Sequence, residues 1–234
     1  MISIIGNGNV ATHLYNALKD KTEISIINSR SLETLPQNTD VIIICVSDNA
    51  ISKIVSNLPP SDAIIVHTSG SIPMDILKKY GSEYGVFYPL QTFTKGIDLE
   101  YSDIPVFIEG SSERVVEKLK EIASLFSNDI HNADSETRRK LHLASVFACN
   151  FTNALARISQ SLVEKSGIDF SVLRPLMKQT IKKLDVISPE EAQTGPAVRG
   201  DSIVIDKHLE MLSDHPDLKT LYQQMTKIIQ NGKI

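Results

Sequence analysis

The sequence predicts an α/β protein in which a domain with a parallel sheet is followed by an all-α domain. In the first half of the chain, short β-rich runs alternate with amphipathic helical patterns, and several of these runs are continuously apolar. Alternation of this kind indicates a parallel sheet, and continuous apolarity is typical of strands covered on both faces. Strand patterns almost cease after Asp134, so we expect the two domains at residues 1–133 and 134–234.

The expected strands and helices of the first domain follow one another closely. The strand patterns cover residues 2–5, 24–27, 41–46, 63–67, 85–88, 105–109 and 129–132. A first helix is expected where Val10, Leu14 and Leu18 share one face, and a second is expected after Asp48, which would be its N-cap. A third helix is expected over residues 113–126.

The second domain has the pattern of a helical bundle. The longest expected helix covers residues 135–165, carries small residues at three- and four-residue steps, and ends at Gly167. Residues 188–201 are rich in turn formers. Further helices are expected at about residues 169–186, 202–213 and 216–229.

Composition excludes several classes of function. The net charge is −4, without the basic excess that is usual in nucleic-acid-binding proteins. No apolar run reaches the length of a membrane-spanning helix and no secretory leader precedes the first strand, so a cytoplasmic protein without a membrane partner is expected. Cys45 and Cys149 lie in apolar runs and are expected to be buried free thiols. No His or Cys spacing predicts a metal site.

A glycine-rich turn directly follows the first strand. The segment reads Gly6, Asn7, Gly8, Asn9, Val10, Ala11, which is the G-x-G-x-x-A form of the Rossmann dinucleotide-binding fingerprint. The first glycine permits the tight turn, the second lets a pyrophosphate approach the backbone, and the alanine stays small where helix and strand pack. The following helix would offer its free N–H groups to the phosphates. The alternative is a tight turn that binds no ligand.

The end of the second strand indicates which dinucleotide is bound. Proteins that prefer NAD usually place a carboxylate there, about 20 residues after the fingerprint, to hold the ribose 2′-hydroxyl. This chain has Asn28, Ser29 and Arg30 instead. A hydroxyl and a guanidinium suit a 2′-phosphate, so the cofactor is expected to be NADP rather than NAD. The alternative is that Arg30 is an ordinary solvated charge.

Other polar residues follow the expected strands, where ligands of open α/β sheets bind. Val46 and Ser47 would contribute to the cofactor site. The residues expected to line a substrate cleft are His67, Thr68, Ser69, Gln91 and Thr92. Helix capping by Ser47 and Ser69 and a structural role for His67 are equally compatible with the pattern.

The long helix supplies two residues with possible acid–base or hydrogen-bonding chemistry. His142 and Asn150 lie about 80° apart around an ideal helix. An imidazole and a carboxamide beside a nicotinamide would hold and protonate a carbonyl or imine group, or else tie the two domains together. The run at residues 138–140 is expected to be solvated, and His13 is expected to have a surface or capping role.

Several motifs together resemble a known family. They are the fingerprint, residues 28–30 and 46–48, and the more particular segments 67–70, 88–93, 141–145 with Asn150, and 194–201. The chain resembles a bacterial family of NADP-dependent oxidoreductases that join a Rossmann-like domain to a helical C-terminal domain of unknown function. Its cofactor domain is similar to those of pyrroline-5-carboxylate reductase and deazaflavin-dependent NADP oxidoreductase. The resemblance implies hydride transfer between a nicotinamide and an unidentified small molecule.

The helical half resembles the C-terminal domain of 6-phosphogluconate and β-hydroxyacid dehydrogenases, which pairs with its own copy. The resemblance implies a homodimer through this domain. Those enzymes carry a catalytic lysine four residues before an asparagine, whereas this chain has Val146 and Cys149 at the two matching positions. Tyr88 also stands where histidine is more usual. The alternative function is therefore a non-catalytic protein that binds or senses NADP.

Overall fold

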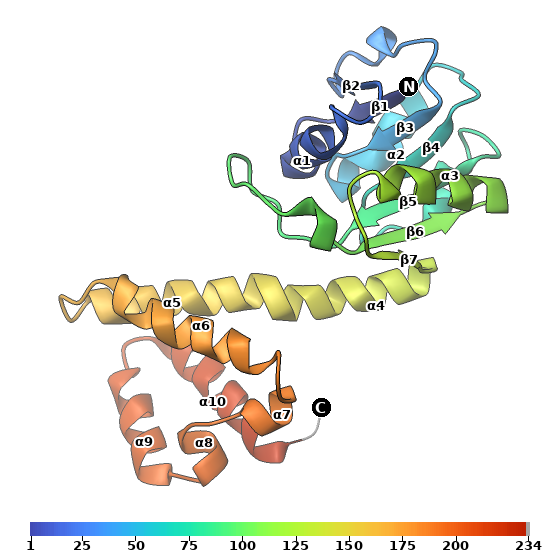
Figure 1. Cartoon of the computed structure of the whole chain (residues 1–234). Helices are drawn as coiled ribbons and strands as arrows, with labels where there is room; N and C mark the ends of the chain where they lie inside the picture. Colours follow the sequence, from blue (N-terminus) through green and yellow to red (C-terminus); the bar gives the residue numbers. More distant parts are fainter. Residues whose placement is uncertain (233–234) are drawn as a thin grey trace. The chain divides into compact units, whose positions relative to one another are not determined.

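The computed structural model describes residues 1–232, apart from the side chain of Thr34, and divides into two compact units (Figure 1). The first unit covers Met1–Ala154, and the second begins at Leu155. The boundary expected at residue 133 follows the change in secondary structure, because the last strand ends at Asn132 and the next helix begins at Ser135. The division at Ala154 follows the packing of the chain instead.

One sheet of seven strands, counted over residues 1–232, forms the centre of the first unit. The strand order is β2-β1-β3-β4-β5-β6-β7, and all neighbours are parallel except β5 and β6. The strands are β1 (Ile2–Ile5), β2 (Ile24–Ile27), β3 (Val41–Ile44), β4 (Ile64–His67), β5 (Tyr84–Pro89), β6 (Val106–Gly110) and β7 (Ile130–Asn132). The Rossmann-like sheet expected from the sequence, followed by a helical region, is confirmed.

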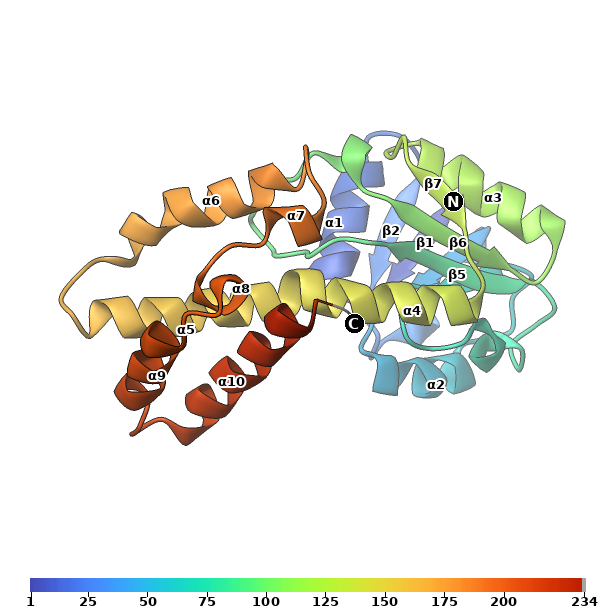
Figure 2. The same cartoon turned by 90° about the horizontal axis from the view of Figure 1, so that it is seen from below.

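Both faces of the sheet are buried, as the continuously apolar runs predicted. Every residue of β1, β3 and β4 is buried, and successive side chains enter opposite apolar clusters. The helices α1 (Asn9–Leu18) and α3 (Glu113–Ser124) pack on one face. The helix α2 (Asp48–Asn57) packs on the other face, and Figure 2 shows α2 and α3 on opposite sides of the sheet.

Two local predictions in the first unit need correction. The N-cap of α2 is Ser47, and Asp48 lies in the first turn. The expected helix 135–165 is not a uniform α-helix, because a π-helical segment (Val146–Phe151) separates α4 (Ser135–Ser145) from α5 (Thr152–Glu164). Such segments follow i→i+5 hydrogen bonding, which a 3.6-residue hydrophobic pattern does not reveal.

The second unit is helical and begins within α5, and further helical segments follow. They are the 3₁₀ turn η5 (Phe170–Leu173), α6 (Arg174–Lys183), α7 (Pro189–Ala192), α8 (Pro196–Arg199), α9 (Ser202–Met211) and α10 (Pro216–Asn231). The turn-rich residues 188–201 therefore contain two helices, the first held by a capping box between Ser188 and Glu191. Large apolar side chains of this unit, including Leu176, Ile181 and Val186, are exposed. None of the helices within residues 1–232 has the length and apolarity to cross a membrane.

Candidate dinucleotide and substrate site

The glycine-rich turn lies between β1 and α1, at the carboxyl edge of the parallel strands. Gly6 has a φ of +135° and donates its N–H to the carbonyl oxygen of Ile27 at 3.0 Å. A Cβ atom at this position would collide with the carbonyl oxygen of Cys45 on the neighbouring strand. The turn therefore requires glycine here for reasons internal to the fold.

Gly8 differs from Gly6 because its missing side chain leaves open space. It is the N-cap residue of α1, and a Cβ atom there would meet nothing within 4 Å. Ala11 is fully buried against the sheet, and the first turn of α1 carries no acidic residue. A cradle of exposed backbone at the positive end of a helix fits the pyrophosphate of a dinucleotide.

The end of β2 supplies the residues expected to select NADP. An Asx-turn orders this segment, because Arg30 donates its N–H to Oδ1 of Asn28 at 2.9 Å. The Arg30 side chain is exposed and makes no ion pair within residues 1–232. Ser29, Arg30 and Lys53 of α2 line one hollow of about 540 Å³, together with Ile54. Sequence reasoning missed Lys53, because only the packing of α2 brings it beside the end of β2.

The residues after β3 lie at the same carboxyl edge of the sheet. Cys45 is buried, and burial raises the pKa of its thiol to about 12, so this thiol stays protonated and unreactive. Val46 is half-buried. Ser47 is exposed and its hydroxyl does not cap α2, so the side chain remains available at the edge of the sheet. Cys149, in contrast to its expected burial, is half-exposed.

The side chains after β4 form hydrogen bonds with the backbone of the protein. His67 is 0% exposed, and its Nδ1 accepts from the N–H of Ser69 at 3.1 Å while Nε2 lies 3.4 Å from the carbonyl oxygen of Pro73. Burial lowers the pKa of His67 to about 4, so the ring is neutral. The hydroxyl of Ser69 accepts two backbone N–H groups, and Thr68 donates to the carbonyl oxygen of Ile44. His67 and Ser69 were expected either to contact a ligand or to have structural roles, and these hydrogen bonds favour structural roles.

Gln91 and Thr92, expected beside the substrate, are exposed in the loop after β5. Oε1 of Gln91 accepts from the N–H of Thr92 at 2.7 Å. The two side chains therefore line no enclosed cleft within the first unit.

His142 meets Tyr88 at the carboxyl end of β5. The hydroxyl of Tyr88 lies 3.1 Å from Nδ1 of His142, whereas Nε2 makes no hydrogen bond within residues 1–232. Burial raises the pKa of Tyr88, which keeps the phenol protonated at neutral pH. A Cβ atom at Gly70 would lie 2.6 Å from Nδ1 of His142, so the imidazole occupies the space of a missing side chain. The hydrogen bond between Tyr88 and His142 can hold a proton between the phenol oxygen and Nδ1.

Asn150 is exposed within the π-helical segment. No hydrogen bond joins it to His142 over the described part of the chain. The geometric pairing expected for an ideal helix does not apply, because the π-helical segment changes the angular spacing between the two residues.

Arg138, expected to be solvated, is 1% exposed and forms a buried ion pair with Glu109 of β6. Its remaining N–H groups donate to the carbonyl oxygens of Ser69 at 3.1 Å and of Ile72 at 2.6 Å. Glu109 also accepts from the N–H and hydroxyl of Ser135. This network fixes α4 on the sheet one helical turn before His142. No sequence signal separates Arg138 from its two basic neighbours.

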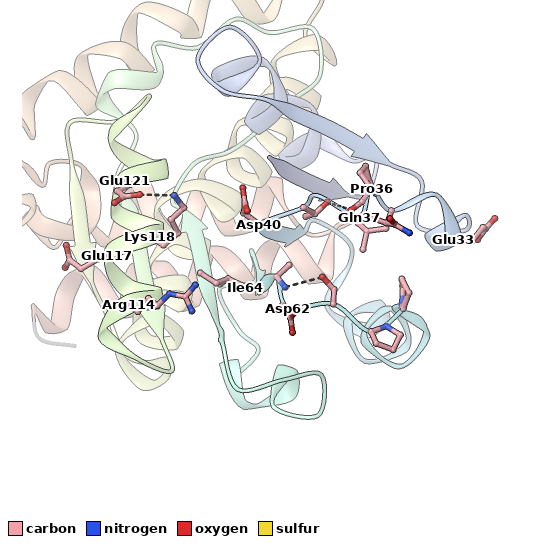
Figure 3. Close-up of a pocket in the computed structure, with 16 residues that line it drawn as sticks. Glu33, Pro36, Gln37, Asp40, Asp62, Ile64, Arg114, Glu117, Lys118 and Glu121 are labelled. Atoms are coloured by element: carbon pink, nitrogen blue, oxygen red, sulfur yellow. Dashed lines mark hydrogen bonds and ion pairs between the residues drawn. The ribbon is translucent and has the colours of Figure 1, made fainter.

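Another hollow of the first unit lies away from these residues. It has a volume of about 1200 Å³ and is lined by residues at the amino ends of β3 and β4 and by charged residues of α3 (Figure 3). Asp40, Ile64, Arg114 and Lys118 are among them. Since the glycine-rich turn and Tyr88 lie at the carboxyl ends of their strands, this hollow is at the opposite edge. Among the described residues, no cluster of three or more His, Cys, Asp or Glu could hold a metal ion.

Comparison with known proteins gives one family and several similar structures. The family model described as a domain of unknown function, DUF2520, matches residues 104–229. No curated protein sequence matches significantly. A Bacteroides fragilis structure, whose description names a candidate NADP oxidoreductase, is similar with 37% identity and a TM-score of 0.90, covering 98% of this chain and 97% of that one.

Two further structures extend the comparison. Protein TM1727 of Thermotoga maritima is 26% identical with a TM-score of 0.77, covering 99% of this chain and 98% of that one. A reductive aminase from Aspergillus terreus, solved with NADPH and ethyl levulinate, is 14% identical with a TM-score of 0.71 and covers 100% of this chain and 95% of that one. At that identity the likeness concerns the fold alone.

The buried ion pair leads to a stability prediction. Replacing Arg138 by Met leaves the Glu109 carboxylate, whose side chain is only 13% exposed, without its cation, which costs about 3 kcal/mol of unfolding free energy. The matched control is Arg139→Met, because Arg139 is the exposed neighbour on the same helix and should change stability by less than about 0.5 kcal/mol. Urea unfolding of both variants measures the difference, and equal losses would contradict the role assigned to Arg138.

Proposed function

The chain belongs to the DUF2520 family, and from that premise we propose that it is an oxidoreductase that uses NADP to reduce or oxidise a small molecule. The observation that carries this proposal is the open cradle at Gly8, which the fold does not need for its own packing. The relative from Bacteroides fragilis supports the same activity. The resemblance recognised from the motifs identified this family correctly.

We infer that three groups of residues hold the cofactor. The backbone of residues 6–11 would bind the pyrophosphate, and Val46 and Ser47 would line the path toward the nicotinamide. Ser29 and Arg30, with Lys53 across the hollow, would bind the 2′-phosphate. When bound, the nicotinamide supplies or accepts a hydride.

The proton chemistry is assigned to the pair of Tyr88 and His142. Nε2 of His142 is the free nitrogen of the ring, and it would hydrogen-bond the oxygen of a carbonyl or the nitrogen of an imine. Tyr88 orients the ring through Nδ1, and Gly70 provides the space for it. Asn150 remains a proposed second donor, and the exposed Gln91 and Thr92 are proposed to contact the outer part of the substrate.

A second function is favoured by one specific feature. Neither Val146 nor Cys149 replaces the lysine of the hydroxyacid dehydrogenases that the helical half resembles. A protein that binds or senses NADP without turnover would not need that lysine. The two functions differ in whether NADPH is consumed.

Steady-state consumption of NADPH against imines, ketoacids and quinones tests the proposed activity. We expect turnover with at least one class, and His142→Ala should lower kcat on the order of 10²–10⁴-fold, the range for loss of a general acid–base group. NADPH affinity should change little. Tight NADPH binding without turnover on any class would instead support the sensing protein.

Gly8→Val tests the cradle. A branched side chain fills the space proposed for the pyrophosphate, so NADPH binding should be lost. The variant should fold normally because a Cβ atom at Gly8 meets no neighbour. Gly6→Ala is the contrasting variant and should be destabilised, because its Cβ atom collides with Cys45. Calorimetric titration with NADPH and a thermal melt separate the two effects, and undiminished binding by Gly8→Val would make the turn purely structural.

Arg30→Ala tests the preference for NADP. Loss of a charge-assisted contact to the 2′-phosphate should weaken NADPH binding by about 1–3 kcal/mol and leave NADH binding unchanged. Fluorescence titrations of both cofactors measure this, with Arg139→Ala as the control for loss of an exposed arginine. The assignment fails if both cofactors lose equally, or if the unmodified protein binds both alike.

We also propose that the helical half forms a homodimer. Its exposed apolar side chains and the open apolar groove lined by Leu155, Leu162, Leu212 and Met225 support this, because isolated domains rarely expose so much apolar surface. Sedimentation at micromolar concentration should give twice the 25.9 kDa of one chain. A single 25.9 kDa species would overturn the dimer.

A further inference from the structure

We propose that Lys95 belongs to the dinucleotide site, that its ammonium group binds the pyrophosphate, and that His13 positions the loop that carries it. This inference rests on the proposed binding of a nicotinamide dinucleotide. It assigns a cofactor contact to Lys95 in the loop between β5 and the 3₁₀ turn η3 (Tyr101–Asp103), a residue that lies outside the motifs found in the sequence.

The loop is fastened to α1 by a buried histidine. His13, expected to have a surface or capping role, is only 3% exposed. Its Nδ1 lies 3.0 Å from the hydroxyl of Tyr101, and its Nε2 lies 2.9 Å from the carbonyl oxygen of Thr94. The Phe93 ring packs against the imidazole at a centroid distance of 5.0 Å. Two loop residues, Phe93 and Thr94, and Tyr101 of the adjoining 3₁₀ turn are therefore held by α1, the helix that follows the glycine-rich turn.

This anchoring brings Lys95 to the glycine-rich turn itself. Nζ of Lys95 donates to the carbonyl oxygen of Asn7 at 2.6 Å and lies 3.4 Å from the Oδ1 atom of the same residue. The backbone N–H of Lys95 donates to Oδ1 of Asn9 at 3.4 Å. The two asparagines occupy variable positions of the fingerprint and flank the open position at Gly8. One loop residue thus makes three contacts around the proposed phosphate cradle.

The charge of this lysine is not neutralised by the protein. Within residues 1–232, Lys95 forms no ion pair, and its partners are neutral carbonyl and amide oxygens. The first turn of α1 also lacks an acidic residue. A phosphate oxygen is a stronger partner for an ammonium group than a neutral oxygen, and the helix N-terminus adds to the local positive potential. A doubly charged pyrophosphate is the ligand that complements this arrangement.

The position of Lys95 predicts an effect distinct from that of Arg30. The pyrophosphate is common to NADP and NAD, whereas only NADP carries the 2′-phosphate. Lys95→Met should therefore weaken NADPH and NADH by the same factor, on the order of ten-fold for the loss of one charge-assisted contact. Binding of adenosine 2′-monophosphate, which has no pyrophosphate, should be unchanged by Lys95→Met and weakened by Arg30→Ala.

The role of His13 is tested through Lys95. His13→Phe keeps an aromatic ring but removes both hydrogen bonds, so the loop should lose its anchor and both dinucleotides should bind more weakly. If His13 acts by positioning Lys95, the double variant His13→Phe/Lys95→Met should bind no more weakly than Lys95→Met alone. Additive losses would overturn that role. Lys95→Arg, which keeps the positive charge, should restore most of the affinity.

Calorimetric titrations of the whole protein decide between the outcomes. Lys79→Met, at another exposed lysine of the first unit, is the control, and thermal melts show that each variant is folded. The Kd of Lys95→Met should also depend less on salt concentration, because one charge contact is lost. If Lys95→Met binds both dinucleotides like the unmodified protein, this inference fails and the proposed function stands. If the unmodified protein binds neither dinucleotide, both fail.

Discussion

The buried ion pair between Arg138 and Glu109 is the interaction on which the geometry of the candidate site depends. Desolvating two charges is costly, and here every other donor and acceptor of the pair has a partner in Ser135, Ser69 or Ile72, which offsets that cost. The pair joins α4 to β6 and to the loop after β4 at once. Because Arg138 is bound to two different elements, α4 cannot turn about its own axis. The next turn of α4 therefore presents His142 to the sheet rather than to solvent.

The loop after β4 also determines which residue packs against the ring of His142. His67 and Ser69 use their side chains to shape the loop, and this leaves Gly70 as the surface against which the imidazole rests. Any side chain at Gly70 would displace His142 from Tyr88. The residues expected to contact a substrate after β4 thus serve the site indirectly. They build the support for a residue that arrives from another part of the chain.

The fold and the glycine-rich turn could be predicted from the sequence because their signals are local. Continuous apolar runs specify buried strands, and Gly6, Gly8 and Ala11 act within one strand–turn–helix unit. Arg138 and His13 could not be predicted, because their burial depends on partners that are distant in sequence, Glu109 and Thr94. An arginine in a basic run looks solvated until the opposing carboxylate is known. The π-helical segment could not be predicted for another reason. Its i→i+5 hydrogen bonds do not change the hydrophobic pattern of the sequence.

The two parts of the proposed function, dinucleotide binding and proton transfer, differ in the same way: the first depends on a local sequence signal and the second on residues distant in sequence. The proposed dinucleotide site is a turn whose shape one short motif determines, so the class of ligand can be inferred from that motif. The proposed proton chemistry depends on Tyr88 and His142, which are 54 residues apart and meet only because α4 is fixed on the sheet. Burial keeps the Tyr88 phenol protonated, and the phenol in turn occupies Nδ1, so only Nε2 remains to face a substrate. A single imidazole nitrogen can bind a carbonyl oxygen or an imine nitrogen equally well. The substrate must therefore be selected by the surroundings of this nitrogen rather than by the His–Tyr pair itself.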